Sequence, residues 1–505
     1  MKYIKINPAD NVAVALQDLS KGEVVEGVTL ATDIPRGHKI VLQGLRAGEN
    51  VIKYGFPIGH VTRDAEAGTL VDHSCIKTNL EGLLEYHYKP ALADIPESAS
   101  KRTFMGFRRA DGQVGIRNQI WVIPTVGCVN GICEQIVSRF KAELEKGVVG
   151  DGVKDCSEAP MESVDAIVCF PHNYGCSQLG DDHENTRKVL SDMVHHPNAG
   201  GVLVVSLGCE NNQLDAFREL VGPVDESRVK MFVCQKVDDE IQYGVERLRE
   251  IYAVCSRDKR TEVPVSELRV GLKCGGSDGL SGITANPLLG VFSDWIVSQG
   301  GTTVLTEVPE MFGAETILMN RCQDSATFDK TVHLINDFKE YFIKQGMPVY
   351  ENPSPGNKAG GISTLEEKSL GCTQKCGKSI VRGVLKYAER LSVKGLNLLS
   401  APGNDLVAST ALAASGCQIV LFTTGRGTPF GSFVPTMKIS TNTPLYQAKP
   451  SWIDFNAGVL AQGESMEEVS ARFIEFVLAA ASGEPVNNEK HGIREIAIFK
   501  QGVTL

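Results

Sequence analysis

The chain has 505 residues, 42% of them hydrophobic and 22% charged, and a formal net charge of −10 at pH 7. This length exceeds what one ordinary core holds, so we expect two or three domains. The acidic balance and the lack of a Lys/Arg cluster argue against nucleic acid and anionic membranes as partners, because polyanions attract basic patches. An anionic small molecule would therefore have to be bound by local donors rather than by the overall field.

The cysteine content and the N-terminal segment both bear on the cellular compartment. The segment MKYIKINPAD lacks the apolar stretch of a signal peptide, and no apolar run approaches the length that spans a bilayer. We therefore expect a cytoplasmic protein, whose 14 cysteines are small buried residues, metal ligands or reactive thiols rather than disulfides. The sequence is compatible with a homo-oligomer and does not specify one.

Changes in composition and in hydrophobic periodicity divide the chain into a β-rich segment, a linker and a large α/β part. Residues 1–87 alternate short strand-like runs with glycine turns, and residues 88–103 are rich in Pro, Ala and Ser, as in a linker. From residue 104, buried-strand runs such as IWVIPTV and GGVLVVSLG alternate with helix-like segments, with a break between residues 104–262 and 263–505. The predicted fold class is α/β: a small β-rich domain, then a large α/β part of two sub-domains with mostly parallel sheets. The two sub-domains could equally form one unit.

Four predicted strands are each followed by a cysteine: Cys128, Cys176, Cys209 and Cys274. A single such cysteine is more often a small buried residue than a ligand. Four at equivalent positions favour a shared metal site, because loops at the carboxyl ends of parallel strands meet at one edge of a sheet. The spacing is not that of a zinc ribbon or a ferredoxin. Whether the four converge depends on the strand order.

Several polar loops are candidates for binding a carboxylate. Ser277 and Asp278 belong to a glycine-rich segment after a predicted strand, which suits either a backbone cradle for an anion or a tight turn. Asn357 and Lys358 lie in the loop ENPSPGNKAGG, where a lone lysine is usually only solvated. Arg426 stands between two glycines after a buried strand, which favours a bidentate grip on a carboxylate. The segment GCTQKCGKS has five residues between its glycines instead of four, so it is no P-loop.

Acid–base candidates are fewer. His38 lies in a turn that leads into a strand, Tyr54 lies at another strand end, and His172 follows the strand VDAIVCF. A loop histidine whose pKa lies near neutral pH is the usual general acid or base, although a lone histidine is more often structural.

Several long blocks resemble the altronate/galactarate dehydratase family: TVGCVNG, HNYGCSQLGDDH, LGCENNQ, CGGSDGLSGITANP, TEVPEMFGAE, ENPSPGNKAGG and FTTGRGTP. IPRGHKI and NVIKYGFPIG resemble its N-terminal SAF-type domain, a β-clip-like fold, and residues 177–183 with AIFKQGVTL resemble the altronate branch. The resemblance implies conversion of D-altronate into 2-dehydro-3-deoxy-D-gluconate with loss of water, in hexuronate breakdown. It also implies dependence on Fe²⁺, with Mn²⁺ or an iron–sulfur cluster as alternatives.

For this chemistry we expect His38 or His172 as acid–base residue and Tyr54 as a further catalytic candidate. Arg426 and Lys358 would hold the carboxylate, together with Ser277, Asp278 and Asn357. Metal ligands would come from the four strand-end cysteines and from Glu307 and Glu310, for which a surface or N-cap role is as plausible. Asp182 and His183 would read sugar stereochemistry, unless they simply begin a helix.

Three other functions remain open at this point. Another lyase of the same family would act on galactarate or on a sulfonated hydroxy acid. A sugar-acid sensor would bind without turnover. An iron–sulfur electron carrier would hold a redox-active cluster and show no dehydration.

Overall fold

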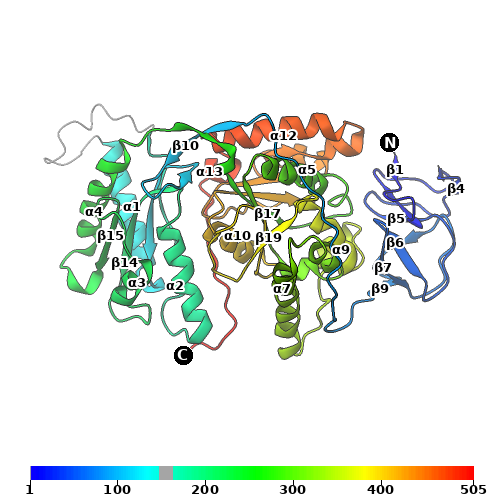
Figure 1. The fold of residues 1–505 in the computed structure, drawn as a ribbon, viewed down its shortest axis with the longest axis horizontal. Coiled ribbons are helices and arrows are strands. Elements are labelled where there is room, and N and C mark those ends of the chain that lie inside the picture. Colours follow the sequence, from blue (N-terminus) through cyan, green and yellow to red (C-terminus); the bar gives the residue numbers. More distant parts are fainter. Residues whose placement is uncertain (1, 147–162) are drawn as a thin grey trace.

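The computed structural model describes residues 2–146 and 163–505, and three domains follow one another across its length (Figure 1). The N-terminal β domain lies at one end, the second domain at the other, and the third domain between them. The predicted fold class, a small β-rich domain followed by α/β sub-domains with parallel sheets, is confirmed. No helix among the described residues is long and apolar enough to cross a lipid bilayer.

The N-terminal domain consists of short strands joined by tight turns. One sheet has the order β1-β2-β5-β8, a second has the order β6-β7-β9, and β3 pairs with β4. The short strands give the domain two small apolar cores rather than one large one. The strands are β1 Tyr3–Ile4, β2 Val12–Ala15, β3 Val24–Val25, β4 Val28–Thr29, β5 Lys39–Val41, β6 Asn50–Lys53, β7 Phe56–Val61, β8 Leu70–Val71 and β9 Ile76–Lys77.

Residues 78–102 contain no helix or strand and run along the third domain. The Tyr86 hydroxyl donates to Glu315 Oε1 at 2.6 Å, and the Ser98 N–H donates to Ser298 O at 2.9 Å. The connection is therefore longer than the predicted linker of residues 88–103, and it is fixed in place by hydrogen bonds.

The second domain is built on a four-stranded parallel sheet with the order β13-β12-β14-β15, next to a small antiparallel sheet of β11, β10 and β16. Every residue of β12 is buried, as expected for a parallel strand covered by helices on both faces. Its elements are β10 Thr103–Arg108, β11 Val114–Gly115, β12 Gln119–Pro124, η1 Gly127–Val129, α1 Asn130–Glu145, β13 Ala166–Cys169, α2 Gly180–Val194, β14 Ala199–Ser206, α3 Leu214–Val221, β15 Val229–Val233, η4 Cys234–Lys236, α4 Glu240–Cys255 and β16 Thr261–Pro264.

The third domain has a seven-stranded parallel sheet with the order β19-β20-β18-β17-β21-β22-β23. Helices cover both faces, with α5 and α12 packed together on one of them (Figure 1). The strands are β17 Arg269–Cys274, β18 Thr302–Leu305, β19 Val381–Leu385, β20 Gly395–Leu399, β21 Ile419–Thr424, β22 Thr436–Ser440 and β23 Phe455–Asn456. The helices are η5 Val265–Glu267, α5 Ala285–Ser298, η6 Val308–Met311, α6 Glu315–Met319, α7 Ser325–Lys344, α8 Pro355–Ala359, α9 Leu365–Cys372, η7 Thr373–Cys376, α10 Asp405–Ala414, α11 Thr443–Ala448, η8 Gly458–Gln462, α12 Met466–Ala481 and α13 Asn487–Lys490.

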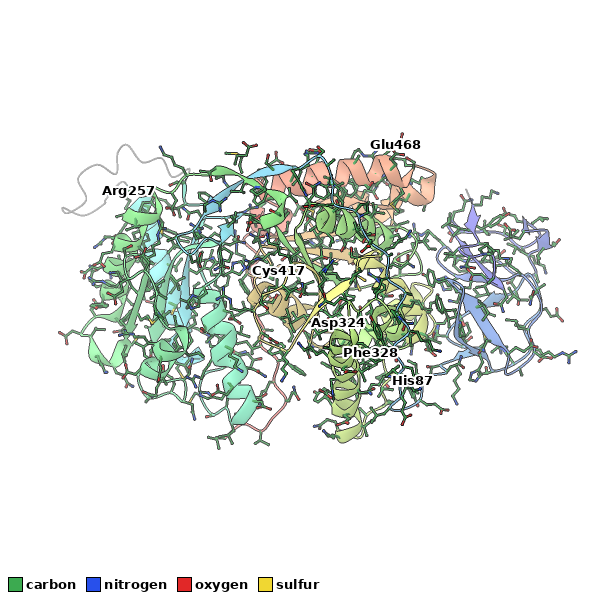
Figure 2. The ribbon with its side chains drawn as sticks, in the orientation of Figure 1. His87, Arg257, Asp324, Phe328, Cys417 and Glu468 are labelled. Atoms are coloured by element: carbon green, nitrogen blue, oxygen red, sulfur yellow. The ribbon has the colours of Figure 1, made fainter. Side chains whose placement is uncertain are left out.

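One apolar core runs through the second and third domains. Trp121 of β12 packs edge-to-face against Phe433, which precedes β22, with ring centroids 5.5 Å apart. Cys417, just before β21, is buried in the same core (Figure 2). Because apolar burial is continuous across the boundary, the two domains pack as one body behind the N-terminal domain.

A buried carboxylate fastens the N-terminal domain to the third domain. Glu367 of α9 accepts from Lys39 Nζ at 2.9 Å and from Lys53 Nζ at 2.7 Å, and all three side chains are almost fully buried. Burial alone would raise the pKa of Glu367, but Lys39 and Lys53 lower it to about 2. The carboxylate therefore stays ionised across the ordinary pH range and holds two strands, β5 and β6, against one helix.

We expect Glu367→Gln to lower the free energy of unfolding by about 3–5 kcal/mol, because two buried lysines lose their counter-ion. Since the folded pKa lies below the ordinary value, this contribution is present above about pH 4 and is lost as the pH falls toward 2. Urea unfolding followed by circular dichroism measures both effects. Glu464→Gln, which breaks an exposed ion pair with Arg472, is the matched control and should cost at most about 1 kcal/mol. Equal losses in the two variants would contradict this prediction.

Candidate functional site

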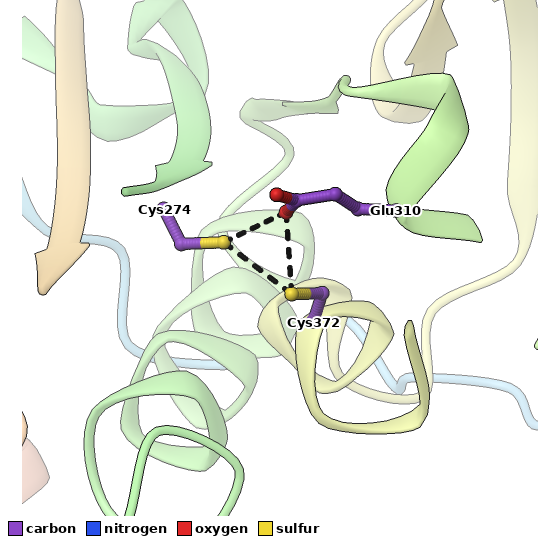
Figure 3. Close-up of side chains that lie close together, drawn as sticks. All are labelled: Cys274, Glu310 and Cys372. Atoms are coloured by element: carbon purple, nitrogen blue, oxygen red, sulfur yellow. Dashed lines mark hydrogen bonds between the residues drawn. The ribbon is translucent and has the colours of Figure 1, made fainter. Parts of the chain in front are cut away.

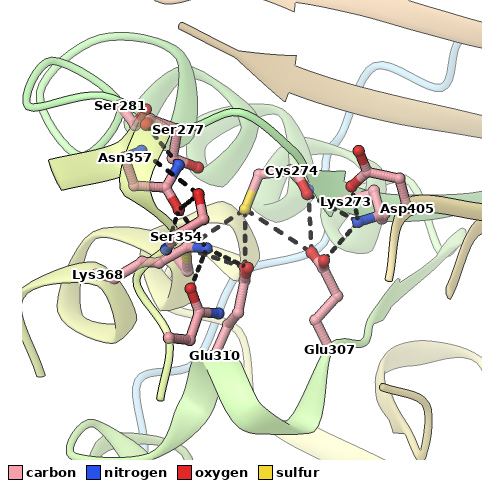
Figure 4. A network of polar contacts seen from close by, with 12 residues as sticks. Lys273, Cys274, Ser277, Ser281, Glu307, Glu310, Ser354, Asn357, Lys368 and Asp405 are labelled. Carbon is pink, nitrogen blue, oxygen red and sulfur yellow. Dashed lines mark hydrogen bonds and ion pairs between the residues drawn. The ribbon is translucent and has the colours of Figure 1, made fainter. Parts of the chain in front are cut away.

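The candidate site begins at the carboxyl end of β17, near the middle of the seven-stranded sheet. Lys273 and Cys274 end this strand, and both side chains are buried (Figure 4). Lys273 Nζ donates to Asp405 Oδ1 at 2.9 Å and also contacts Glu307. The strand end thus places a cation and a thiol at the sheet edge where ligands of α/β proteins bind.

Glu307, just before η6, adopts a left-handed backbone conformation with φ +70°. Such a conformation costs free energy in a residue with a Cβ and is maintained only when its surroundings fix it. Here the Cys274 N–H donates to Glu307 Oε2 at 3.1 Å. The turn directs two carboxylates of the same loop, Glu307 and Glu310, toward the end of β17 (Figure 4).

Cys274, Glu310 and Cys372 form a compact group of metal-ligating side chains (Figure 3). Cys274 Sγ lies 2.9 Å from Glu310 Oε2, and Cys372 Sγ lies 3.3 Å from both of these atoms. Among the described residues, this is the only set of three such side chains whose ligand atoms all lie within 4.8 Å of one another. All three are buried, so three acidic groups in contact need protons or a cation between them.

Two lysines from α9 and η7 complete this group. Lys368 Nζ lies 2.8 Å from Glu310 Oε1, and Lys375 Nζ lies 2.9 Å from Cys274 Sγ. The hydrogen bond from Cys372, with the charges of Lys375 and Lys368, lowers the pKa of Cys274 to about 6 against the effect of burial. The same hydrogen bond and burial raise the pKa of Cys372. The pair therefore consists of one thiolate and one thiol at neutral pH.

A cleft of about 420 Å³ lies between the N-terminal domain and the third domain. Arg36 and His38 line it from the N-terminal domain, and Asp278 and Arg426 from the third. The domains approach closely beside it, since a Cβ on Gly279 would lie only 2.0 Å from Gly37 O. No carboxylate among the described residues forms an ion pair with Arg36 or Arg426, so the two guanidinium groups remain available to an anion.

A second, much smaller cavity adjoins this cleft, and Asp278 lines both. Its walls include Lys53, Tyr54, Ser277 and Cys372. Tyr54 has a left-handed backbone with φ +62°, and burial raises the pKa of its phenol. The Ser277 hydroxyl is buried and has no hydrogen-bond partner among residues 2–146 and 163–505. A path of polar groups therefore leads from the arginines of the cleft to the buried thiols.

The structure thus brings together many of the predicted site residues. Lining the cleft or its inner cavity are His38, Tyr54, Ser277, Asp278 and Arg426. Cys274 and Glu310 lie beside Cys372, and Glu307 contacts Cys274. Asn357 and Lys358 belong to α8 next to the cleft. Asn357 Nδ2 donates to Ser277 O at 2.8 Å and its Oδ1 accepts from Lys368 Nζ at 3.2 Å, so this amide positions two site residues.

Other predicted residues lie in the second domain, away from this cleft. His172 is buried, with Nε2 2.7 Å from Pro124 O and Nδ1 accepting from the Tyr174 N–H, so both ring nitrogens are occupied. Asp182 accepts from the N–H groups of Gln501 and Gly502, which ties the C-terminal segment to α2.

His183 is the next residue of α2 and is half-buried there. Cys128, Cys176 and Cys209 also belong to the second domain, because β12, β13 and β14 form a different sheet from β17.

Sequence reasoning missed five residues of the site: Lys53, Arg36, Lys368, Cys372 and Lys375. Arg36 is two residues from His38, and that proximity to a loop histidine was the available signal. Cys372 follows Lys368 by four residues and precedes Lys375 by three, which places them on one helical face. In the sequence, their segment GCTQKCGKS shows only an imperfect resemblance to a P-loop, which gives no sign of this role.

Comparison with known proteins identifies the family. Three family models match: the altronate/galactarate dehydratase SAF domain over residues 1–79, the D-galactarate dehydratase/altronate hydrolase second domain over 106–256, and the D-galactarate/altronate dehydratase C-terminal domain over 265–504. The chain belongs to the altronate/galactarate dehydratase family. The class of enzyme expected from the sequence, a carbon–oxygen hydro-lyase, is confirmed with it.

Individual members of the family can be compared along the whole chain. The altronate dehydratases of Bacillus subtilis (strain 168) and Escherichia coli (strain K12) are 57% and 56% identical over 100% of this chain and 99% and 100% of their own lengths. The galactarate dehydratase (L-threo-forming) of Escherichia coli (strain K12) is 33% identical over 98% of this chain and 96% of its own.

In this dehydratase we expect Cys372→Ala to raise the pKa of Cys274, because the thiolate loses its hydrogen-bond donor. The loss of one charged hydrogen bond should move the midpoint by about one to two pH units. The midpoint is measured by titrating the ultraviolet absorbance of the thiolate in metal-free protein. The absorbance of Cys274→Ser, which lacks this thiol, is subtracted. Cys376→Ala removes a buried thiol that donates to Thr373 O instead and should leave the midpoint near 6. An unchanged midpoint in Cys372→Ala would refute the assignment of Cys372 as the hydrogen-bond donor to the Cys274 thiolate.

Proposed function

We propose that this chain removes water from D-altronate and releases 2-dehydro-3-deoxy-D-gluconate. The single observation that carries the proposal is the cleft in which Arg36 and Arg426 lead to Tyr54 and the buried thiol pair. Two relatives named altronate dehydratases share far more identity with the chain than the galactarate dehydratase does. This difference supports altronate over galactarate as substrate.

The cleft offers cationic donors in a chain whose net charge is −10. A substrate carboxylate would be bound by Arg426 from the third domain and Arg36 from the N-terminal domain, since a guanidinium group donates two parallel hydrogen bonds to a carboxylate. Lys358, on α8 beside the cleft, adds a further positive charge. Binding between two domains also orients the sugar chain, so that its C2–C3 bond points toward the inner cavity.

The reaction requires a base for the C2 proton and an acid for the C3 hydroxyl. Removal of the C2 proton and departure of the C3 oxygen as water leave an enol, which tautomerises to the 2-keto acid without any redox cofactor. Burial raises the pKa of Tyr54, so its phenol stays protonated and suits the acid that protonates the leaving oxygen. His38, half-buried in the cleft with Nδ1 near Arg36 O, suits the base.

Cys274, Glu310 and Cys372 would hold a divalent ion, which supplies a Lewis acid for the hydroxyl or the enolate. The donor set fits such an ion. Two sulfurs and a carboxylate oxygen favour Fe²⁺ over Mn²⁺, which prefers oxygen ligands. The neighbouring Ser277 hydroxyl has no partner within the described protein.

The charges around this donor set also fit a divalent ion. Five acidic groups and three lysines gather there: Cys274, Cys372, Glu307, Glu310, Asp405, Lys273, Lys368 and Lys375. With every acidic group ionised, two negative charges remain in excess. One divalent ion would neutralise them, and without it two protons must do so.

We expect chelator-treated protein to form no 2-keto-3-deoxy acid from D-altronate and to recover on addition of Fe²⁺, with less recovery in Mn²⁺. Galactarate, assayed in parallel under anaerobic conditions, should react far more slowly. Cys372→Ser should weaken iron binding by about 10–100-fold, whereas Cys376→Ser, four residues on, should not. Full turnover without metal would refute the role of the ion. Turnover of galactarate alone would replace altronate as the proposed substrate and leave the proposed dehydration reaction standing.

We expect substitutions at the two ends of the cleft to act on different kinetic constants. Arg426→Ala should raise KM about 10–100-fold with a smaller effect on kcat, because it binds substrate and transition state alike. Tyr54→Phe should lower kcat by about 10²–10⁴-fold with little effect on KM. Arg63→Ala on the exposed surface of the N-terminal domain is the matched control for Arg426 and should change neither. Full activity of both Tyr54→Phe and His38→Gln would remove these residues from the mechanism.

A further inference from the structure

The second domain presents three exposed thiols at one edge of its sheet. Three of the described cysteines have exposed side chains: Cys128, Cys176 and Cys209. They follow β12, β13 and β14, which are neighbours in the order β13-β12-β14. All three strands are parallel, so their carboxyl ends lie at the same edge. Neither the candidate site of the third domain nor the proposed reaction uses these thiols.

Hydrogen bonds join the three cysteine-bearing loops to one another. The Gly127 N–H donates to Tyr174 O at 2.9 Å, and the Asn212 N–H donates to Gly175 O at 3.0 Å. The Ser177 N–H donates to Asn211 Oδ1 at 2.9 Å. Each cysteine is one or two residues from one of these bonds. The three thiols therefore belong to one connected surface whose loops hold each other in position.

Polar groups at this surface are placed as they would be around bound thiolates. Gln235 Nε2 donates to Cys209 Sγ at 3.6 Å, and Ser177 Oγ donates to Cys176 Sγ at 3.7 Å. Such donors stabilise negative charge on sulfur ligands. On the same loops, Gln178 Nε2 and Asn212 Oδ1 are buried without a hydrogen-bond partner in the part of the chain that the structure describes. Buried polar atoms of this kind are rare in native proteins and call for an unseen partner.

We propose that Cys128, Cys176 and Cys209 are the ligands of an iron–sulfur cluster in the second domain. The three sulfurs do not all lie within 4.8 Å of one another, unlike the Cys274 group. A single tetrahedral ion with metal–sulfur bonds of about 2.3 Å would draw its thiolates to within roughly 3.8 Å. A cluster spaces thiolates farther apart, because each binds a different iron. Spacing therefore favours a cluster over a mononuclear ion.

The coordination number points to a cubane with one iron that lacks a protein ligand. His172, the nearest histidine in sequence to Cys176, has both ring nitrogens hydrogen-bonded within its own domain. Cys234 directly follows β15, the next strand along the sheet, but its thiol is buried in the apolar core of the domain. The three cysteines would thus each coordinate one iron, and the fourth iron would take a small exogenous ligand.

This site is separate from the group around Cys274. The second domain lies on the opposite side of the third domain from the N-terminal domain and its cleft (Figure 1). The sequence pattern had placed Cys274 with the other three, but Cys274 ends a strand of a different sheet. The inference does not rest on the proposed reaction, since the thiols are assigned from their own loops.

The test is anaerobic reconstitution of the full chain with ferric iron, sulfide and a thiol reductant, which together supply the mixed ferric and ferrous irons of the cluster. We expect about four irons and four acid-labile sulfides per chain beyond any iron bound at Cys274, with a broad visible absorption that bleaches on reduction. Cys128→Ser, Cys176→Ser and Cys209→Ser should each lose most of this absorption and of the labile sulfide. Because these side chains are exposed, the far-ultraviolet circular dichroism of each variant should match that of the unsubstituted protein.

Two controls make the result decisive. Cys234→Ser changes a buried thiol at the same edge, and Cys274→Ser changes the third domain, and both should keep the absorption and the sulfide. No sulfide-dependent absorption in the unsubstituted protein would overturn the proposal, as would its survival in the triple variant of Cys128, Cys176 and Cys209. Loss in Cys274→Ser or Cys234→Ser would equally overturn the three-cysteine assignment. Keto-acid formation is assayed separately, so failure of the cluster and failure of the proposed reaction are distinguishable.

Discussion

The candidate site depends on the ion pairs of one buried carboxylate, Glu367, with two lysines of another domain. Lys39 and Lys53 reach it from β5 and β6, while its own helix, α9, carries Lys368 and Cys372. The next residue after Lys53 is Tyr54, so the contact that docks the N-terminal domain also delivers the phenol to the inner cavity. Neither domain alone would form the cleft. Charge pairing thus fixes the relative position of groups that the chain separates by more than 300 residues.

Local charge at the site opposes the overall charge of the chain. Arg36 and Arg426 present guanidinium groups at the cleft that form no ion pair with a described carboxylate, although acidic residues outnumber basic ones in the chain. A general negative field would repel a sugar acid, so selectivity for an anion must come from short-range hydrogen bonds with fixed geometry. The two arginines belong to different domains. Binding of one carboxylate by both would therefore depend on the same docking contact that positions Tyr54.

The sequence predicts those features of the structure that depend only on neighbouring residues. Strand ends are local, because an apolar run followed by glycine marks them. Cys274, Ser277, Asp278 and Arg426 were therefore placed correctly at the sheet edge of the third domain. Cys372 was missed because it lies on a helix whose position is set by packing, and no strand precedes it. The separation of Cys128 from Cys274 could not be predicted either, since it depends on strand order and on which sheet each strand joins.

The two groups of thiols differ in a way that follows from burial. Around Cys274 and Cys372 water is excluded, so uncompensated thiolates would oppose folding, and Lys368 and Lys375 supply the compensation within the protein. The third domain can therefore fold before any ion arrives, and an incoming ion must displace protons or lysine contacts. The exposed thiols of the second domain need no such partners, because water solvates them. A buried site with its own lysines can therefore fold before it binds an ion, whereas an exposed set of thiolates on connected loops suits a cofactor assembled after folding.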